Sequence, residues 1–568
     1  MELTAIWRKF QQRMWLETTT NSSSPGSSLA EIPEDNQSKE LSVSRSKSES
    51  VVEGFTFTGR HAAVFTVLLG SMAVCALDYS ATGNIMSVIA KELHGTTTET
   101  EWIGNGYSLA ACVSQLPISS LSDIFGRKSV FLGVLVFFFV GSIISGTAQN
   151  MSALIAGRVI QGVGGGGCLV LPEVILADTV PLRQRTLYYT IIMIMWCVFS
   201  GCAPMIAGAI TEYSTWRWFF YLNLFLLGAA GLATPFTLKL QTHDEHWRQK
   251  LKKIDIGGAV LVVASTVSFL LALSRGGSSS ELPWSHWSVI LPLVLGFAGF
   301  FITASYEHFT KPAVPMFDFR VFGNTSAMIC YLHNVFQGTV NMSTIYFLPT
   351  FFQGVKGYGQ LVSGACILPL NLIGAPISYG IGAWIERTGH YHLVNLSMWG
   401  LATLGLGLLT SIDAEMNIAS LICIQIPASI GINCLYATLS TTANAVNPPH
   451  LWTESTAMMS FCRSIGDAFG TAIGGAILAS QIHQRIQNLN SEGLSIPDSA
   501  SSLTIVSIIQ DMDNPSTKKA LIEVLVHSMQ TLFIVLTAIC GLSFILTFFQ
   551  KEYDLNQEYD SKQGIIHE

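Results

Sequence analysis

The sequence predicts an all-α polytopic membrane protein, and two observations lead to this prediction. The chain has 568 residues, of which 49% are hydrophobic and only 12% are charged, against about 25% charged residues in an ordinary soluble domain. It also contains many apolar runs long enough to cross a hydrocarbon core, which takes roughly 20 residues per helix. This composition excludes a soluble protein and a disordered one. A net charge of −7 without a basic face excludes nucleic-acid binding as a main role.

The apolar runs predict fourteen transmembrane helices. In chain order the expected spans are 62–84, 102–121, 130–148, 151–177, 187–211, 217–238, 256–274, 288–306, 327–352, 361–384, 393–411, 417–440, 455–481 and 526–549. Because the number is even, both ends of the chain should lie on the same side of the membrane.

Basic residues predict which side that is. They concentrate in the short loops on one face, at Arg127, Lys128, Arg183, Arg185, Lys239, Arg248, Lys250, Lys252, Lys253, Lys311, Arg320 and Arg387. The short loops of the other face hold Lys91, Arg217, Arg275 and Lys356, and the longer loop after the thirteenth span adds Arg485, Lys518 and Lys519. Since cytosolic loops carry the excess of Lys and Arg, both termini are expected in the cytosol.

The two ends of the chain are expected to be cytosolic tails, at 1–60 and 551–568. Residues 17–53 are rich in Ser, Thr, Glu and Asp, which predicts disorder for most of the first tail. The stretch from Ile6 to Trp15 alternates aromatic or apolar residues with basic ones. It is compatible either with an amphipathic helix on the inner leaflet or with a flexible tail.

Ionisable residues inside the expected spans are candidates for function, because charge at membrane depth is costly. Asp78 stands in an otherwise uncharged first span and has no partner nearby in the sequence, which favours a functional role. Arg158 and Glu173 lie in the fourth span. Arg463 and Asp467 lie four residues apart in the thirteenth span, so they could pair with each other as a structural ion pair.

Uncharged polar residues recur at helical spacing in three of the spans. The stripes are Ser71, Cys75, Asp78 and Thr82, then Asn334, Gln337, Asn341 and Thr344, and then Gln425, Ser429, Asn433 and Tyr436. Amide groups facing lipid would go unsatisfied, so these stripes should face the bundle interior or a wet cavity. We expect Asn334, Gln337, Asn341, Gln425, Asn433 and Tyr436 to line a substrate cavity.

The loop between the second and third spans resembles the loop motif of the major facilitator superfamily. It reads Ser-Ser-Leu-Ser-Asp-Ile-Phe-Gly-Arg-Lys over residues 119–128. Gly126 permits a tight turn, and Asp123, Arg127 and Lys128 can build a charge network at an inner gate. Over about residues 60–550 the chain is similar to the fungal 14-span drug:proton antiporter branch of that family. The resemblance implies the major facilitator fold, with six-helix halves at 61–238 and 311–550 and two inserted helices within 239–310.

The fourth and fifth spans carry two more motifs of this branch. Arg158 and Gln161 match the fourth-span motif, whose arginine in relatives takes part in proton coupling, and this implies that role for Arg158. We expect either Asp78 or the region of Arg158 to exchange protons. Residues 203–208 resemble the antiporter motif through Pro204 and Gly208, with alanine at two places where glycine is usual.

Other positions match the branch as structural features. Glu173, Asp178 and Arg183 are similar to the acidic and then basic end of its fourth span, where Asp178 would pair with a loop arginine. The stretches at 216–223 and 346–353 are typical of the 14-span branch. Asp467 departs from the pattern, because a small residue is more usual there; it would either shape the preference for substrate charge or neutralise Arg463.

The leading hypothesis is a secondary transporter that uses an inward proton gradient to export an amphipathic organic compound such as a drug, toxin or secondary metabolite. It would act as a monomer with the lipid bilayer, protons and a small-molecule substrate as its partners. We expect the plasma membrane, with the vacuolar membrane as the alternative. The sequence has no phosphate-binding Walker loop, metal-ligand pattern or nucleophile elbow, so we expect no enzyme, catalytic residue, cofactor or metal site.

Two alternatives keep the same fold. The first is a vacuolar transporter of basic amino acids or a siderophore carrier, as found among fungal 14-span relatives. The second, more remote, is a transporter-like nutrient receptor that signals through its tails.

Overall fold

The computed structural model describes residues 59–238, 247–277, 284–491, 505–512 and 514–557. Phe57–Glu568 forms one compact unit. The expected amphipathic stretch at 6–15, the serine-rich part of the first tail and the end of the second tail lie outside the described residues.

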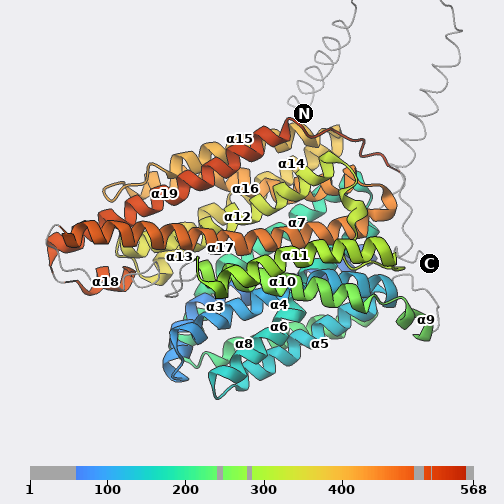
Figure 1. Cartoon of the computed structure of the whole chain (residues 1–568), viewed down its shortest axis with the longest axis horizontal. Helices are drawn as coiled ribbons and strands as arrows, with labels where there is room; N and C mark the ends of the chain where they lie inside the picture. Colours follow the sequence, from blue (N-terminus) through green and yellow to red (C-terminus); the bar gives the residue numbers. More distant parts are fainter. Residues whose placement is uncertain (1–58, 239–246, 278–283, 492–504, 513, 558–568) are drawn as a thin grey trace, which may run out of the picture. The chain divides into compact units, whose positions relative to one another are not determined.

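The first six helices follow the first six expected spans in order (Figure 1). They are α3 (Gly59–Glu92), α4 (Thr97–Phe125), α5 (Arg127–Thr147), α6 (Met151–Thr179), α7 (Leu182–Tyr213) and α8 (Arg217–Thr237). Polar side chains cap their beginnings: Asn150 accepts a hydrogen bond from the Ala153 amide at 2.8 Å, and Thr96 forms a capping box with Glu99. Such caps satisfy backbone donors that a helix leaves free at its start.

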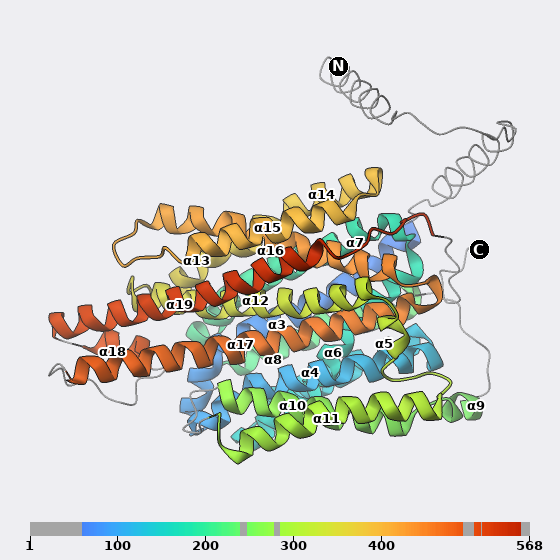
Figure 2. The same ribbon diagram turned by 45° about the horizontal axis from the view of Figure 1, so that its top comes forward.

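Two further membrane helices stand between the first six and the last group. After the short α9 (Trp247–Lys252), the helices α10 (Ile256–Gly277) and α11 (Trp287–Thr310) lie side by side (Figure 2). Helix α10 packs on α4 and on the later helix α17 (Trp452–Ser491). The pair therefore covers one side of the bundle, and α11 exposes aromatic residues such as Phe297 and Phe301 as a lipid-facing helix would.

The last group follows the remaining expected spans. After η1 (Phe319–Phe322) come α12 (Thr325–Gly354), α13 (Gln360–Leu372), α14 (Gly374–Thr388), α15 (Tyr391–Leu409), α16 (Ile418–Val446), η2 (Pro449–Leu451), α17 (Trp452–Ser491), α18 (Ile505–Asp511) and α19 (Pro515–Thr547). The expected span at 361–384 is divided into α13 and α14. Helix α13 ends at Leu372. Pro376 has no amide hydrogen to donate to the Leu372 carbonyl oxygen, and in a continuous helix the proline ring would collide with that carbonyl group.

Twelve helical segments of the described chain are long and apolar enough to cross a membrane. The two expected spans that fall outside this set are α4 and α12, although both form long helices. They are the helices with dense polar faces, for example Asn105 and Gln115 on α4 and His333 and Asn334 on α12. The count of fourteen spans and the domain boundaries therefore stay predictions.

Helix α6 packs closely against α4 and α5 along its glycine-rich run. A Cβ atom at Gly166 would meet the backbone carbonyl oxygen of Ala111 on α4, and one at Gly164 would meet the backbone nitrogen of Phe138 on α5. A neighbouring backbone cannot yield as the end of a flexible side chain can, so only glycine fits at these crossings.

Gly166→Val is expected to destabilise the protein, because its added carbon atoms would overlap the α4 backbone. Overpacking of this kind costs about 1–3 kcal/mol, and more where a backbone must shift. The melting temperature of the purified protein and the amount that reaches the membrane should both fall. Gly228→Val on α8 is the matched control, because nothing lies within 4 Å of a Cβ atom there; equal losses in both variants would contradict the prediction.

Candidate functional site

Asp78 lies in a buried hydrogen-bonded cluster built by three of the first six helices. Its Oδ2 is 2.5 Å from Nη1 of Arg158 on α6. Its Oδ1 accepts hydrogen bonds from Gln161 Nε2 on α6 at 2.9 Å and from Asn223 Nδ2 on α8 at 2.8 Å. Asp78 is 0% exposed and Arg158 is 1% exposed. The cluster therefore joins α3, α6 and α8 around one ion pair.

The sequence offers Asp78 no partner on its own helix, and in the structure its partner, Arg158, comes from α6. Arg158 is held further by the Ile103 carbonyl oxygen, 3.1 Å from its Nε, and by the ring of Tyr107, whose centroid is 4.4 Å from the guanidinium carbon. In this conformation neither charge reaches solvent. Proton exchange at Asp78 stays a prediction, and it requires a conformation in which this cluster opens.

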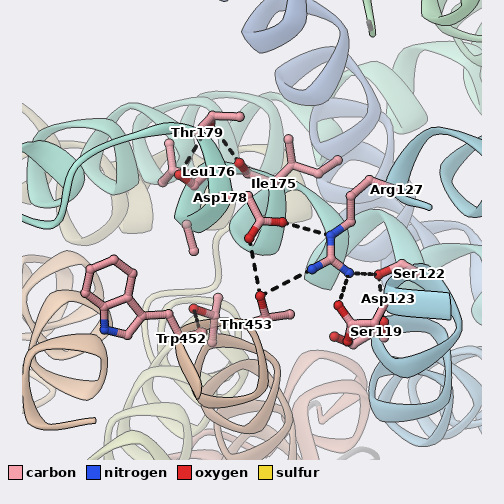
Figure 3. A network of polar contacts seen from close by, with 12 residues as sticks. Ser119, Ser122, Asp123, Arg127, Ile175, Leu176, Asp178, Thr179, Trp452 and Thr453 are labelled. Carbon is pink, nitrogen blue, oxygen red and sulfur yellow. Dashed lines mark hydrogen bonds and ion pairs between the residues drawn. The ribbon is translucent and has the colours of Figure 1, made fainter. Parts of the chain in front are cut away.

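The loop motif connects the first six helices to α17 (Figure 3). Gly126 has a φ of 92°, which turns the chain between α4 and α5 and favours glycine. The buried Arg127 lies 2.6 Å from Asp123 Oδ1 and 2.8 Å from Asp178 Oδ2. Its Nη2 also donates to Thr453 Oγ1 at 3.2 Å, and Thr453 donates to Asp178 Oδ1 at 3.3 Å. Asp178 is thus paired with the arginine of the loop motif.

Arg183, at the start of α7, makes a second connection at the same end of the bundle. It donates to the carbonyl oxygens of Glu386 at 2.6 Å and Arg387 at 2.9 Å, near the end of α14. Gly389, which ends α14, has a φ of 79°, so like Gly126 it has a positive φ, although its ψ of −8° differs from the 144° of Gly126. We call this end of the bundle, where Arg127 and Arg183 lie, the loop-motif end.

Apolar contacts and the chain after α19 also close the loop-motif end. Leu182, Ile385, Trp452 and Leu555 belong to one buried cluster. The side chain of Asn556 accepts a hydrogen bond from Arg183 at 3.0 Å. The early and late helices therefore touch through charges, hydroxyls and apolar side chains, and this end is shut in the conformation described.

Lys128 differs from Arg127 although both belong to the loop motif. Its Nζ donates to the carbonyl oxygen of Pro235 on α8 at 2.9 Å. This contact stays within the first six helices, so Lys128 does not bridge to α17 as Arg127 does. Of the charged residues expected in the network, Asp123 and Arg127 come together and Lys128 points elsewhere.

A third ion pair lies deeper between the two groups of helices. Arg463 Nη2 on α17 is 2.8 Å and 3.1 Å from the two carboxylate oxygens of Glu173 on α6. Tyr436 on α16 donates to Glu173 Oε1 at 2.7 Å, and its ring centroid is 4.1 Å from the Arg463 guanidinium carbon. The expected pairing of Arg463 with Asp467 is therefore wrong: the buried Glu173 takes the arginine with both oxygens, and the half-buried Asp467 makes no ion pair within the described chain.

The polar stripes of α12 and α16 lie mostly inside the bundle. Asn334 and Gln425 are buried and donate to the carbonyl oxygens of Cys330 and Leu421, each four residues earlier on the same helix. The other residues expected to line a cavity are Gln337 and Asn433, which are buried, and Asn341 and Tyr436, which are half-buried. The helical spacing of these amide residues is explained by their position inside the bundle, and their role in lining a substrate cavity stays a prediction.

The antiporter-like motif lies on α7. Pro204 is half-buried and Gly208 is exposed, with nothing within 4 Å of a Cβ atom at Gly208. Ala203 and Ala207, which stand where glycine is usual, are both 0% exposed. The bundle therefore accommodates the two extra methyl groups on its inner face, and the role of the motif in exchange stays a prediction.

At the end of the first six helices opposite the loop-motif end, the tryptophan–arginine stretch at the start of α8 bonds to the ends of α3 and α5. Arg217 is 2.5 Å from Glu92 Oε1 at the end of α3 and donates to the Ala148 carbonyl oxygen after α5 at 3.1 Å. Trp216 Nε1 donates to Glu92 Oε2 at 2.8 Å. The hydrogen bond from Arg217 lowers the pKa of Glu92.

Three residues that bond to the charged site residues were not predicted from the sequence as their partners. Asn223, as a polar side chain within an apolar span, carried a signal that it would be buried and bonded. Thr453 carried none, because a threonine at the start of a helix is common. Asn556 lies in a segment that was expected only as a tail.

Comparisons with known proteins agree on one family. The family model described as the Major Facilitator Superfamily matches residues 68–471. The chain is 32% identical over 525 residues to MFS transporter L2 of a Phoma species, covering 92% of this chain and 87% of that protein. It is 30% identical over 514 residues to efflux pump FUS6 of Gibberella moniliformis, covering 89% and 90% respectively. Among solved structures, the proton:xylose symporter XylE matches with a TM-score of 0.55 and 12% identity over 87% of this chain and 97% of that one.

Proposed function

The chain belongs to the major facilitator superfamily, and on that premise we propose that it is a proton-coupled secondary transporter that exports amphipathic organic compounds by alternating access. The relatives that carry the word efflux in their names support export, and they match along nearly their whole length. Because these relatives are fungal, a drug, toxin or secondary metabolite is the expected cargo.

The observation that carries the proposal is the closed loop-motif end. Arg127 with Thr453, Arg183 with Glu386, and Arg463 with Glu173 each join an early helix to a late one. These contacts must break for the bundle to open at that end, while contacts within each group of six helices can persist. Two bodies that rock about a central site are what alternating access needs.

The orientation and the domains follow from the same proposal. The loop-motif end holds much of the basic excess, so it faces the cytosol, and both termini lie there. The two six-helix halves are 61–238 and 311–550, with α10 and α11 as an insertion between them. A monomer in the plasma membrane is the form that we propose to act.

Proton coupling is assigned to the Asp78–Arg158 pair. A proton on Asp78 would remove the charge that holds Arg158, which would then turn to other acceptors. Coupling requires that protonation of Asp78 shift the equilibrium between the state open to one side of the membrane and the state open to the other. Binding of the cargo must shift the same equilibrium in the opposite direction. Gln161 and Asn223 both donate hydrogen bonds to Asp78 Oδ1, so these contacts would also have to rearrange when the cluster opens.

The test is uptake into inside-out membrane vesicles that contain the full chain and have an acidic lumen. Radiolabelled cycloheximide serves as an uncharged amphipathic probe, and tetraphenylphosphonium serves as a charged one. We expect at least one of them to accumulate beyond the level of vesicles without the protein, with no ATP present. Nigericin, which collapses the pH gradient, should abolish that accumulation. Accumulation that survives nigericin would contradict proton coupling, and accumulation of neither probe would contradict broad export of amphipathic compounds.

A further inference from the structure

The chain stays against the loop-motif end after its last helix, α19, has ended. Residues 551–557, which we call the tail segment, bond to several of the late helices. The Lys551 amide donates to Ser326 Oγ on α12 at 3.0 Å. The Tyr553 amide donates to the Tyr391 hydroxyl on α15 at 2.7 Å. Because both bonds come from the backbone, they fix the path of the tail segment rather than the position of one side chain.

Leu555 places the tail segment in an apolar site. It is 3% exposed, whereas its neighbours Asp554 and Asn556 are exposed. Its buried cluster includes residues of α7, α14, α15 and α17, namely Leu182, Ile385, Tyr391 and Trp452. Two residues later, Gln557 Nε2 donates to the carbonyl oxygen of Ala445 on α16 at 2.9 Å. One buried leucine between exposed polar residues gives the tail segment a single register on this surface.

The tail segment also contacts an early helix, through Arg183 of α7. Arg183 Nη1 donates to Asn556 Oδ1 at 3.0 Å, while Nε and Nη2 donate to the carbonyl oxygens of Glu386 and Arg387. The guanidinium therefore has acceptors on α14 and on the tail segment. If α7 moved away from the late helices, Arg183 would lose these acceptors, and Leu182 would leave the apolar cluster that holds Leu555.

We propose that the tail segment is a latch, and that the surface of α12, α15 and α16 is its binding site. Held by Leu555, it presents Asn556 to Arg183 and keeps the loop-motif end shut. A bound group shifts a two-state equilibrium only through its different affinity for the two states. Here the difference comes from α7, because Arg183 and Leu182 meet the docked segment only when this end is closed. The inference rests on the proposed function, since a latch acts only if this end opens during the cycle.

Cysteine labelling of the purified full-length chain measures this opening. The reporter is Thr441→Cys, in a chain whose exposed cysteines Cys202 and Cys423 are replaced by serine. Thr441 is 0% exposed and shares a 2.7 Å hydrogen bond with Thr186 on α7. A maleimide can therefore reach residue 441 only when the early and late helices part, and its rate of reaction follows the population of the open state.

Two variants of the tail segment should raise the labelling rate. Leu555→Ala should raise it about tenfold or more, which corresponds to about 1.4 kcal/mol, because it leaves a cavity in the apolar site. Asn556→Ala should raise it about threefold, because it removes one exposed hydrogen bond from Arg183. Leu406→Ala on α15 is the matched control. It truncates a leucine that is 0% exposed, but in a cluster made by late helices alone, so the labelling rate should not change.

The latch would be overturned if Leu555→Ala and Asn556→Ala label at the rate of the parent, or if Leu406→Ala gains as much as Leu555→Ala. Melting temperatures establish that each variant is folded, and Asn556→Ala carries the test if Leu555→Ala does not fold, because its side chain is exposed. Faster labelling in Arg127→Ala alone would overturn the latch and keep the opening of this end. Labelling of no folded variant would overturn that opening and alternating access with it. Faster labelling in Leu555→Ala without uptake of either probe into vesicles would keep the latch and overturn export.

Discussion

Asp78→Ala is expected to remove most of the folded protein from the membrane. The substitution leaves the Arg158 guanidinium buried, with Gln161 and the Ile103 carbonyl as its remaining hydrogen-bond acceptors, and neither carries a charge. Breaking a buried ion pair by removing one partner costs about 3–5 kcal/mol. The measurement is the melting temperature and the yield of the purified protein, each compared with those of the parent.

A double variant separates a structural role of this pair from a coupling role. Asp78→Ala combined with Arg158→Met removes both charges, and replacing a buried pair by apolar residues is often nearly neutral for stability. We expect the double variant to recover most of the melting temperature and to lose uphill uptake under a pH gradient. Uphill uptake by the folded double variant would assign coupling elsewhere. A single variant as stable as the parent would contradict the sealed ion pair.

Arg127→Ala is expected to open the loop-motif end. Asp123 and Asp178 would lose the guanidinium group that they share, and Thr453 would lose its donor from α5. Hydrogen bonds to charged groups contribute about 1.5–3 kcal/mol each, so the population of the open state should rise by at least tenfold. Export should fall, because the transporter would stay in one of its two states.

Labelling of Thr441→Cys by a membrane-impermeant maleimide reports this opening from the loop-motif side. Thr441 is 0% exposed and shares a 2.7 Å hydrogen bond with Thr186 of α7, so it becomes reachable when the early and late helices part. The exposed cysteines Cys202 and Cys423 are first replaced by serine. Lys128→Ala is the matched control, because Lys128 bonds only within the first six helices in the described structure. Similar labelling rates in the two variants would contradict the gate.

The positions of the helices were predictable because each depends on a local property. A run of about 20 apolar residues forms a helix in a bilayer whatever its neighbours are, and the structure has a helix at each expected span. The division of one span at Leu372 was also encoded locally, by Pro376, although it was not predicted. The loop motif at 119–128 is equally local, and the positive φ of Gly126 agrees with the turn expected there.

The sequence by itself determined the membrane class, the order of the helices, the family and the inward placement of most of the polar stripes. Only the tertiary structure decided which charges meet. Asp78 has no partner nearby in the sequence and is paired with Arg158, eighty residues away. Arg463 could have paired with Asp467 on its own helix and pairs with Glu173. The physical reason is that an ion pair depends on distances of a few ångströms between side chains of different helices, and these distances are set by how the helices pack, whereas spacing along one helix reports only the face on which a residue lies.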